Sequence, residues 1–538
     1  MKKFGFLAVL LLPFLASCGL DLGTAGYSYI EADMVLPRAE ETNLTYHDFF
    51  YQVDVGSRKC LPGSGESRLL VIPVAFEDFP FGQYIVQDLQ AVYQSKNGNY
   101  PSVSSFYDVS SYGQKQLTFE IAPVFDTDFT LKEAFDLAGS KRLSSYLLPL
   151  AVNSYEGDLA SFDLDQDGYL DGVVLVYSAP DYQSYDYSSL LDEDEESELW
   201  AYTYNLSGQP ANHERPSPFS YSWISSSFIE KGEAGGLSYD PHTFIHETGH
   251  LLGLDDYYST DRADPSSSAP ASEKYRAPLG MLDMMDYGLL DHNAFSKWSL
   301  GWINPFYVEE EAFGSKQSIT VELKDLVTYG EAICIPARGN DYFGNAFGEY
   351  ILVELYSPTS LNSYDAGCHY QSGYPNGYSM PGLRLYHVDA RMWGKGQAFG
   401  NAYYGGNPAD INWRHLGVNP LNASYDVAAS NTYSQSSPAN RRFNLLHLLE
   451  ADGTYTFKNE EFEEKGYLFG ADNSTLFYPD ATHGEFDMKR FASFFVNEDE
   501  NGEGLFNDGS TFGYQIRING IHALKEGGHE ASITISLA

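Results

Sequence analysis

Two histidines and a glutamate near the middle of the chain have the types and spacing that metal-dependent hydrolysis requires. His246 and His250 are four residues apart, and Glu247 directly follows the first of them. On an α-helix, residues four apart lie on one face, so both imidazole rings can bind one metal ion. Glu247 then lies beside the metal, where its carboxylate can act as a general base. The pattern H-E-x-x-H therefore predicts a zinc site that activates water.

A zinc ion that performs chemistry has three protein ligands and one open position. Gly253 stands just past His250 and can end the helix in a left-handed conformation, and Asp256 follows three residues later. We predict Asp256 as the third ligand. The alternative is Glu273, because thermolysin-like enzymes take a glutamate from a second helix, but Glu273 lies in a segment rich in Ser, Ala and Pro that is a poor helix.

A second set of metal-binding side chains lies in the acidic segment 163–171, where carboxylates occur at alternate positions and a glycine follows. This spacing is typical of the first half of an EF-hand loop and predicts a structural calcium site. Val174 occupies the position of the usual closing glutamate, so Asp171 must close the site by another route. An acidic turn without an ion is the alternative. The predicted calcium ligands are Asp163, Asp165, Asp167, Tyr169 and Asp171.

The string H-E-x-x-H-x-x-G-x-x-D resembles the metzincin pattern, with aspartate in place of the usual third histidine. The stretch His246–Tyr258 resembles the active-site helix of the immune inhibitor A family of bacterial metallopeptidases. The likeness extends from about Leu69 to about Pro305, with weaker echoes beyond. It implies a zinc-dependent endopeptidase that hydrolyses peptide bonds of extracellular proteins, with Glu247 as the general base.

The segment 279–288 resembles the metzincin Met-turn. The resemblance implies that Met285 lies beneath the zinc ligands and that Tyr287 reaches the metal or the reacting carbonyl. A tyrosine hydroxyl there can donate to a developing oxyanion, which makes Tyr287 a catalytic candidate. Core methionines and a packed tyrosine are the alternative.

The hydrophobic pattern around these residues predicts an α+β fold, and the resemblance implies a metzincin-like zinc peptidase domain over residues 68–305. Apolar runs and amphipathic stretches mark its elements. We expect the strand Trp200–Tyr204 to border the substrate cleft, with the substrate extended along an exposed sheet edge. Asp192–Glu196 is a charge run of the kind usually found in solvated loops. The other expected elements are strands at Leu69–Phe76, Gln116–Val124 and Val173–Tyr177, and helices near Tyr84–Tyr93 and Lys141–Val152.

Residues 306–538 show short β-rich runs separated by Gly, Asn, Asp and Ser. We predict a C-terminal β-sandwich-like region of one or two modules. The expected strands are Ser318–Leu323, Tyr350–Tyr356, Gly382–Asp389, Thr454–Phe457, Tyr514–Ile518 and Ala531–Leu537.

The beginning of the chain has the pattern of a lipoprotein signal peptide over residues 1–17, in which an apolar stretch follows two lysines and leads to Cys18. We expect Cys18 to carry lipid, which places the protein on the extracellular face of the bacterial cell membrane, with the lipid as its only membrane contact. An ordinary secretory signal is the alternative. Residues 18–67 are predicted to be a tether or short pro-segment, in which Cys60 is a candidate for a cysteine switch or a structural cysteine.

The charge balance is strongly acidic, with 32 basic against 74 acidic residues and a net charge of −42. Such a surface repels polyanions, so nucleic acid is excluded as a partner, whereas calcium is favoured. We expect a monomer that acts on polypeptide substrates. The rival interpretation is a cell-surface binding lipoprotein that recognises host protein or glycan, with an inactive or glycoprotein-directed peptidase domain.

Overall fold

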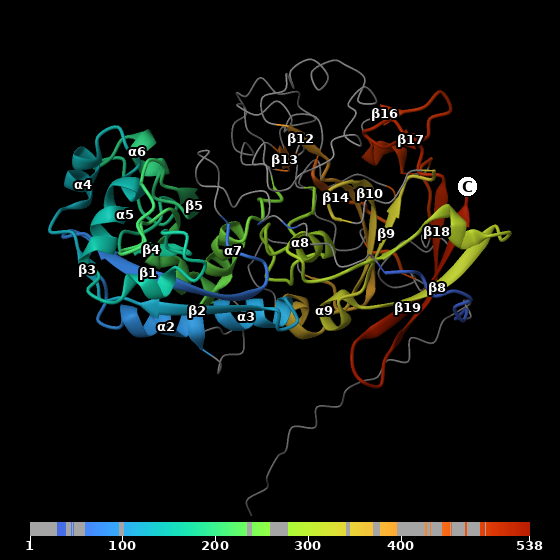
Figure 1. Cartoon of the computed structure of the whole chain (residues 1–538), viewed down its shortest axis with the longest axis horizontal. Helices are drawn as coiled ribbons and strands as arrows, with labels where there is room; N and C mark the ends of the chain where they lie inside the picture. Colours follow the sequence, from blue (N-terminus) through green and yellow to red (C-terminus); the bar gives the residue numbers. More distant parts are fainter. Residues whose placement is uncertain are drawn as a thin grey trace, which may run out of the picture.

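The protein is described here from a computed structural model, in which the part of the chain before about residue 300 lies beside the strands that follow it (Figure 1). Among the described residues no helix is both long enough and apolar enough to cross a bilayer. The described residues are 29–38, 45, 47, 60–95, 102–233, 239–258, 278–339, 345–368, 377–394, 425–427, 431, 444–451, 453, 468–470, 485–489, 491–495 and 497–538.

The first part of the chain forms a mixed sheet with the strand order β2-β1-β4-β6-β5, to which β3 adds by pairing with β1. Neighbouring strands are parallel except β5, which runs antiparallel to β6. Within the described residues β5 pairs with β6 alone, so β5 is an edge strand of this part of the structure. The strands are β1 (Gly65–Ala75), β2 (Lys115–Ile121), β3 (Phe125–Asp126), β4 (Val173–Tyr177), β5 (Tyr202–Asn205) and β6 (Ser220–Ser225).

Helices cover both faces of this sheet, because successive side chains of a strand point to opposite faces. Leu69 and Val71 of β1 belong to a hydrophobic core shared with α2 (Ile85–Gln94), α3 (Val103–Ser110) and α7 (His242–Leu251). The alternate residues of β1 belong to a second core, shared with α4 (Leu131–Ala138) and α5 (Leu143–Ser154). All five residues of β4 are buried, as expected for a strand covered on both sides.

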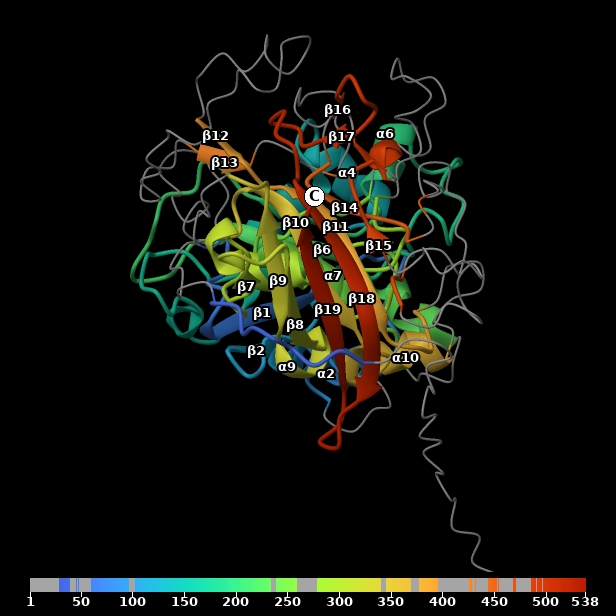
Figure 2. The same ribbon diagram turned by 90° about the vertical axis from the view of Figure 1, so that its right-hand side faces the viewer.

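The second part of the chain forms two further sheets that face each other. One has the order β14-β11-β10-β9-β7 and the other β15-β18-β19-β8, and their facing residues share one hydrophobic core. Figure 2 shows β18 and β19 in front of the sheet that contains β9, β10 and β11. The strands are β7 (Phe306–Tyr307), β8 (Ser318–Lys324), β9 (Ala332–Pro336), β10 (Glu349–Tyr356), β11 (Gly382–Asp389), β14 (Leu446–Leu448), β15 (Glu485–Phe486), β18 (Tyr514–Ala523) and β19 (His529–Leu537).

Strands β10 and β11 are buried along their whole length. One face contributes to the core between the two C-terminal sheets. The opposite face, which includes Leu352, Tyr386 and Val388, belongs to the same hydrophobic core as helix α7. The two parts of the chain are therefore packed together through a continuous apolar core, with no solvated layer between them at these strands.

The remaining elements are short. They are the helices α6 (Glu193–Ser197), α8 (Ala294–Ser299), α9 (Leu326–Tyr329) and α10 (Ser363–Cys368), the strands β12 (Met392–Gly394), β13 (Tyr425–Val427), β16 (Asn497–Glu498) and β17 (Gly504–Leu505), and 3-10 turns at Leu159–Phe162, Ser226–Glu233, Glu310–Phe313, Ser360–Asn362 and Ala492–Phe494.

The predicted α+β fold class is confirmed, and most predicted strands appear within a few residues of their expected bounds. The charge run Asp192–Glu196 was predicted to be a loop, which is wrong: its residues from Glu193 onward open α6. Asp192 accepts a hydrogen bond from the backbone N–H of Glu195, and the Glu195 side chain accepts one from the N–H of Asp192, so a capping box starts the helix. The predicted strand Thr454–Phe457 lies outside the described residues.

The segment predicted as a tether or short pro-segment is partly packed onto the fold. Asp33 donates its N–H to Thr320 O of β8 at 2.9 Å, and Ser532 Oγ of β19 donates to the carbonyl of Ile30. Further along, Leu61 N donates to Leu251 O at the end of α7 at 2.8 Å. Residues at both ends of this segment therefore contact the folded body.

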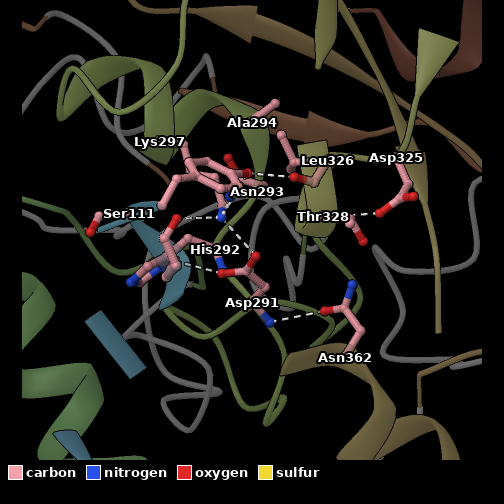
Figure 3. Close-up of polar contacts among 12 residues, drawn as sticks. Ser111, Asp291, His292, Asn293, Ala294, Lys297, Asp325, Leu326, Thr328 and Asn362 are labelled. Carbon is pink, nitrogen blue, oxygen red and sulfur yellow. Dashed lines mark hydrogen bonds and ion pairs between the residues drawn. The ribbon is translucent and has the colours of Figure 1, made fainter. Parts of the chain in front are cut away.

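A buried ion pair lies where the two parts of the chain meet. Lys297 Nζ of α8 is 2.7 Å from Asp291 Oδ2, and these side chains are 0% and 3% exposed. Lys297 also donates to Ser110 O at 2.6 Å and to the hydroxyl of Tyr112 at 3.1 Å. Tyr112 in turn donates to Leu326 O of α9. The pair therefore joins α3, α8 and α9 (Figure 3).

Replacing Lys297 by alanine should lower the free energy of unfolding by about 3–5 kcal/mol, because it leaves a buried carboxylate without its counter-charge. Urea denaturation of the two proteins would measure the loss. The control is Lys316→Ala, which removes a lysine from an ion pair with Asp33 whose side chains are both 47% exposed. That change should cost less than about 1 kcal/mol. Equal losses in the two variants would contradict this account of the buried pair.

Candidate metal centre

Helix α7 carries both predicted histidine ligands and Glu247, and its end determines where the chain goes next. Gly253 has a φ of 102°, and Leu254 N donates to Gly249 O at 3.0 Å. Gly253 N donates to His250 O at 3.0 Å, which completes a Schellman motif. The left-handed glycine predicted from the sequence is confirmed. It turns the chain back and returns Asp256 to the two histidines.

The three predicted zinc ligands converge. Asp256 Oδ1 lies 2.9 Å from His246 Nε2 and 3.2 Å from His250 Nε2. Two ligand atoms bound at about 2.0 Å to one tetrahedral zinc ion are about 3.3 Å apart, so these atoms are spaced close to what one small cation requires. The side chains are 9%, 17% and 19% exposed for His246, His250 and Asp256, which leaves the site within reach of water.

The hydrogen bonds of the two imidazole rings show which nitrogens face the site. His246 Nδ1 lies 2.9 Å from Met284 O, and His250 Nδ1 lies 2.8 Å from Leu254 O. A carbonyl oxygen only accepts, so each Nδ1 carries a proton and Nε2 is the nitrogen that faces the site. Two Nε2 atoms and a carboxylate oxygen then face one point, which favours a metal ion or a proton there. Metal-binding histidines commonly have such carbonyl partners, so the residues fit a zinc ion.

The charges of these groups agree with that fit. Burial would raise the pKa of Asp256, but His250 and His246 outweigh burial and hold this pKa well below its usual range. Burial would lower the pKa of His250, but the Asp256 carboxylate outweighs burial and raises it to about 10. Asp256 is therefore ionised near neutral pH and attracts positive charge, whether a proton or a metal ion supplies it.

Glu247 lies beside the histidines and is held by the edge strand of the sheet. Ligand atoms of His246, Glu247 and His250 lie within 4.8 Å of one another. Thr203 Oγ1 of β5 donates to Glu247 Oε2 at 2.9 Å, and the same hydroxyl is 2.8 Å from Ser222 Oγ of β6. Burial raises the pKa of Glu247, against the lowering effect of the histidines. A carboxylate with a raised pKa is the stronger base.

Sequence reasoning missed Thr203, although the strand that carries it was predicted to border the cleft. On β5, Tyr202 contacts Ser144 Oγ at 2.8 Å through its hydroxyl, on the face of the sheet covered by α5. The next residue must then point to the opposite face, toward α7. This alternation of side chains along the strand was the signal from which Thr203 could have been predicted.

Met285 lies directly against helix α7. A Cβ added to Gly249, which stands between the two histidines, would lie 2.4 Å from Met285 Sδ. Met285 is fully buried, and its carbonyl accepts from Tyr257 N at 2.9 Å. The methionine therefore packs against α7 between the two histidines, and the helix needs a glycine at this contact.

Tyr287 is half-buried close to the same site. Its ring centroid is 4.9 Å from that of Tyr258, and the Tyr258 ring is 6.4 Å from that of His246. The structure therefore brings Tyr287 into the neighbourhood of the ligands by way of Tyr258, a residue that sequence reasoning did not single out.

The acidic loop before β4 brings three of its predicted ligands together. Carboxylate oxygens of Asp163, Asp165 and Asp171 lie within 4.8 Å of one another. The loop is wound around Asp163, whose oxygens accept from Asp167 N and Gly168 N at 3.0 Å each. Asp167 accepts from Tyr169 N at 2.9 Å within the loop. Among the four predicted carboxylate ligands, Asp167 is outside this group and the other three are in it.

Several predicted residues lie away from the centre or outside the described part of the chain. Cys18 and the alternative ligand Glu273 fall outside the described residues. Cys60 is buried among the apolar residues of the core that contains α7, which is the setting of a structural cysteine. Within the described residues Cys60 and Cys334 form no disulfide.

A comparison with models of known protein families finds no match to this chain, and a comparison with curated protein sequences finds none either. The function must therefore be inferred from the chemistry of the site.

Proposed function

We propose that the chain is a zinc-dependent endopeptidase that hydrolyses peptide bonds of extracellular proteins. The convergence of His246, His250 and Asp256 supports this proposal most strongly, since Asp256 Oδ1 lies 2.9 and 3.2 Å from the two Nε2 atoms. The buried carboxylate of Glu247 beside these ligands supplies the base that hydrolysis requires. The metzincin-like assignment and the lipid anchor at Cys18 are part of the same proposal and depend on the sequence pattern.

Each residue has a distinct task in this mechanism. His246, His250 and Asp256 would hold the zinc ion, which when bound polarises a carbonyl and lowers the pKa of water to about 7. Glu247 accepts a proton from the water that attacks the scissile carbonyl carbon. It then gives the proton to the leaving amine as the C–N bond breaks. Tyr287 is the candidate donor to the developing oxyanion.

The position of β5 as an edge strand supports an extended peptide as the substrate. A sheet edge presents unpaired N–H and C=O groups that bind a strand of any sequence through its main chain. Thr203 links this strand to Glu247 at 2.9 Å, so a peptide beside β5 would lie next to the base. The rival interpretation, a binding lipoprotein, does not require a strand edge next to the carboxylate of Glu247.

Glu247→Ala should reduce proteolysis by roughly 10²–10⁴-fold or more while zinc stays bound, because the change removes the base and leaves the ligands in place. Casein zymography would measure activity, and elemental analysis would measure zinc. A variant that cleaves casein at the wild-type rate would show that this mechanism is wrong. A wild-type protein that cleaved no casein would instead favour the rival interpretation.

Asp256→Ala should lose zinc, whereas Glu273→Ala should retain it. The adjacent Asp255→Ala is the matched control, since it removes a carboxylate from the same turn without removing a predicted ligand. Zinc content after dialysis measures all three. If Glu273→Ala loses zinc and Asp256→Ala retains it, the site belongs to the thermolysin-like class.

Calcium should stabilise the protein through Asp163, Asp165 and Asp171. After EDTA treatment, calcium alone should restore the melting temperature but not proteolysis, because catalysis needs zinc. A ligand at 100 times its dissociation constant adds about 2.7 kcal/mol of stability. Asp165→Ala should remove this calcium-dependent gain, whereas Asp194→Ala in the exposed helix α6 should keep it. A gain that is unchanged in the Asp165 variant would exclude this calcium site.

A further inference from the structure

The C-terminal sheet directs a buried carboxylate toward the segment behind the metal centre. Glu354 of β10 is 2% exposed, and its Oε2 accepts from Ala294 N at 2.8 Å. Its Oε1 accepts from Tyr386 Oη of β11 at 3.2 Å and lies 3.7 Å from Arg384 Nη1. Glu354 is therefore fixed by its own sheet and holds the first residue of α8.

A series of hydrogen bonds continues from that point to helix α7. Asn293 precedes Ala294, and its N and Nδ2 donate to Asp283 Oδ2 at 3.0 and 2.8 Å. The other oxygen of Asp283 accepts from Met285 N at 2.8 Å. The neighbouring Met284 carbonyl is the partner of His246 Nδ1. The series therefore connects Glu354 to the loop that orients one of the histidines.

Asn431 provides a second connection, to the turn that carries the third ligand. Its Nδ2 donates to Leu446 O of β14 at 2.9 Å and lies 3.3 Å from Tyr257 O, and its Oδ1 accepts from Leu446 N at 3.1 Å. Tyr257 is the residue after Asp256. In the same strand, Leu448 N donates to Pro278 O at 2.9 Å, at the start of the Met284–Met285 loop. One sheet thus contacts both segments that complete the site.

A third contact lies beside the ion pair of Lys297. Asn362 follows β10, and its Oδ1 accepts from Asp291 N at 3.0 Å, while its Nδ2 donates to Ser357 O at 3.0 Å (Figure 3). The residues before α8 are therefore held from the C-terminal sheet at Asp291 as well as at Ala294.

We propose that the C-terminal sheet completes the metal centre, with Glu354 and Asn431 as positioning residues for His246 and Asp256. The proposal rests on the zinc site of the proposed function. It differs from the view of residues 306–538 as an appended module, because that view predicts that changes in this region leave zinc binding unaltered. Mutation of residues that orient metal ligands typically weakens metal binding by roughly 10- to 100-fold.

The first test compares two glutamates on one strand. Glu354→Gln and Glu354→Ala are compared with Glu349→Gln, because Glu349 is also in β10 and 5% exposed but contacts His387 and the N–H of Asp508. Zinc dissociation constants are measured on the full chain by competition with a chelator. Visible spectra of the Co²⁺-loaded proteins report the geometry of the ligands. Both Glu354 variants should bind zinc roughly 10- to 100-fold more weakly and change the Co²⁺ spectrum.

The second test compares two buried asparagines. Asn431→Ala should also weaken zinc binding, whereas Asn519→Ala should not, since Asn519 Nδ2 donates to the hydroxyls of Ser532 and Thr534 in the far sheet. Melting temperatures of the metal-free proteins separate general destabilisation from loss of metal affinity. If Glu354→Ala does not fold, Glu354→Gln keeps the side-chain volume and supplies the measurement.

The outcomes are distinct. Weaker zinc binding and an altered Co²⁺ spectrum in the Glu354 and Asn431 variants, with both unchanged in the Glu349 and Asn519 variants, would support the proposal. Unchanged zinc binding in folded Glu354→Gln and Asn431→Ala proteins would overturn it, as would equal weakening in test and control variants. A wild-type protein that takes up no zinc would instead overturn the proposed function itself, and this proposal with it.

Discussion

The arrangement depends on three electron-rich atoms that face one another in a largely buried site. Nε2 of His246, Nε2 of His250 and Oδ1 of Asp256 repel unless a positive charge lies between them. The protein holds them there through groups that cannot easily move away. Main-chain carbonyls fix the two rings through Nδ1, and the turn at Gly253 fixes the carboxylate. Several neighbouring elements support this convergence.

The sheets provide that support from two directions. Strands β4 and β6 pack against one side of α7, and β5 contributes the hydroxyl of Thr203, which donates to Glu247. On the other side, β10 and β11 pack against the Met284–Met285 loop and α8. Strands β10 and β11 are buried on both faces, so each contributes to two hydrophobic cores. The site lies between these strands and the N-terminal sheet.

Local pattern was enough to predict the part of the site that lies in one short segment. The spacing of His246 and His250 and the glycine at Gly253 depend on helix geometry alone, and the apolar run Val173–Tyr177 depends on burial alone. Helix α6 was not predicted, because its capping box lies within a run of acidic residues that was interpreted as a solvated loop. Side-chain alternation along β5 was a signal for Thr203, whereas Glu354 and Asn431 could not be predicted, because each acts across a distance in sequence that only the tertiary fold closes. In the acidic loop, the spacing indicated four carboxylate ligands besides Tyr169, and three of these carboxylates converge.

The docking of the first described segment onto the last strands has a consequence for how the protein reaches its folded state. Ser532 contacts the carbonyl of Ile30 across a separation of 502 residues, and β19 pairs with β8. Contacts between such distant parts of a chain form slowly, because a long loop must close before they contribute. The C-terminal core therefore cannot be completed until β19 has been synthesised. Before that point the chain would expose the apolar faces of β10 and β11, so aggregation competes with folding at this stage.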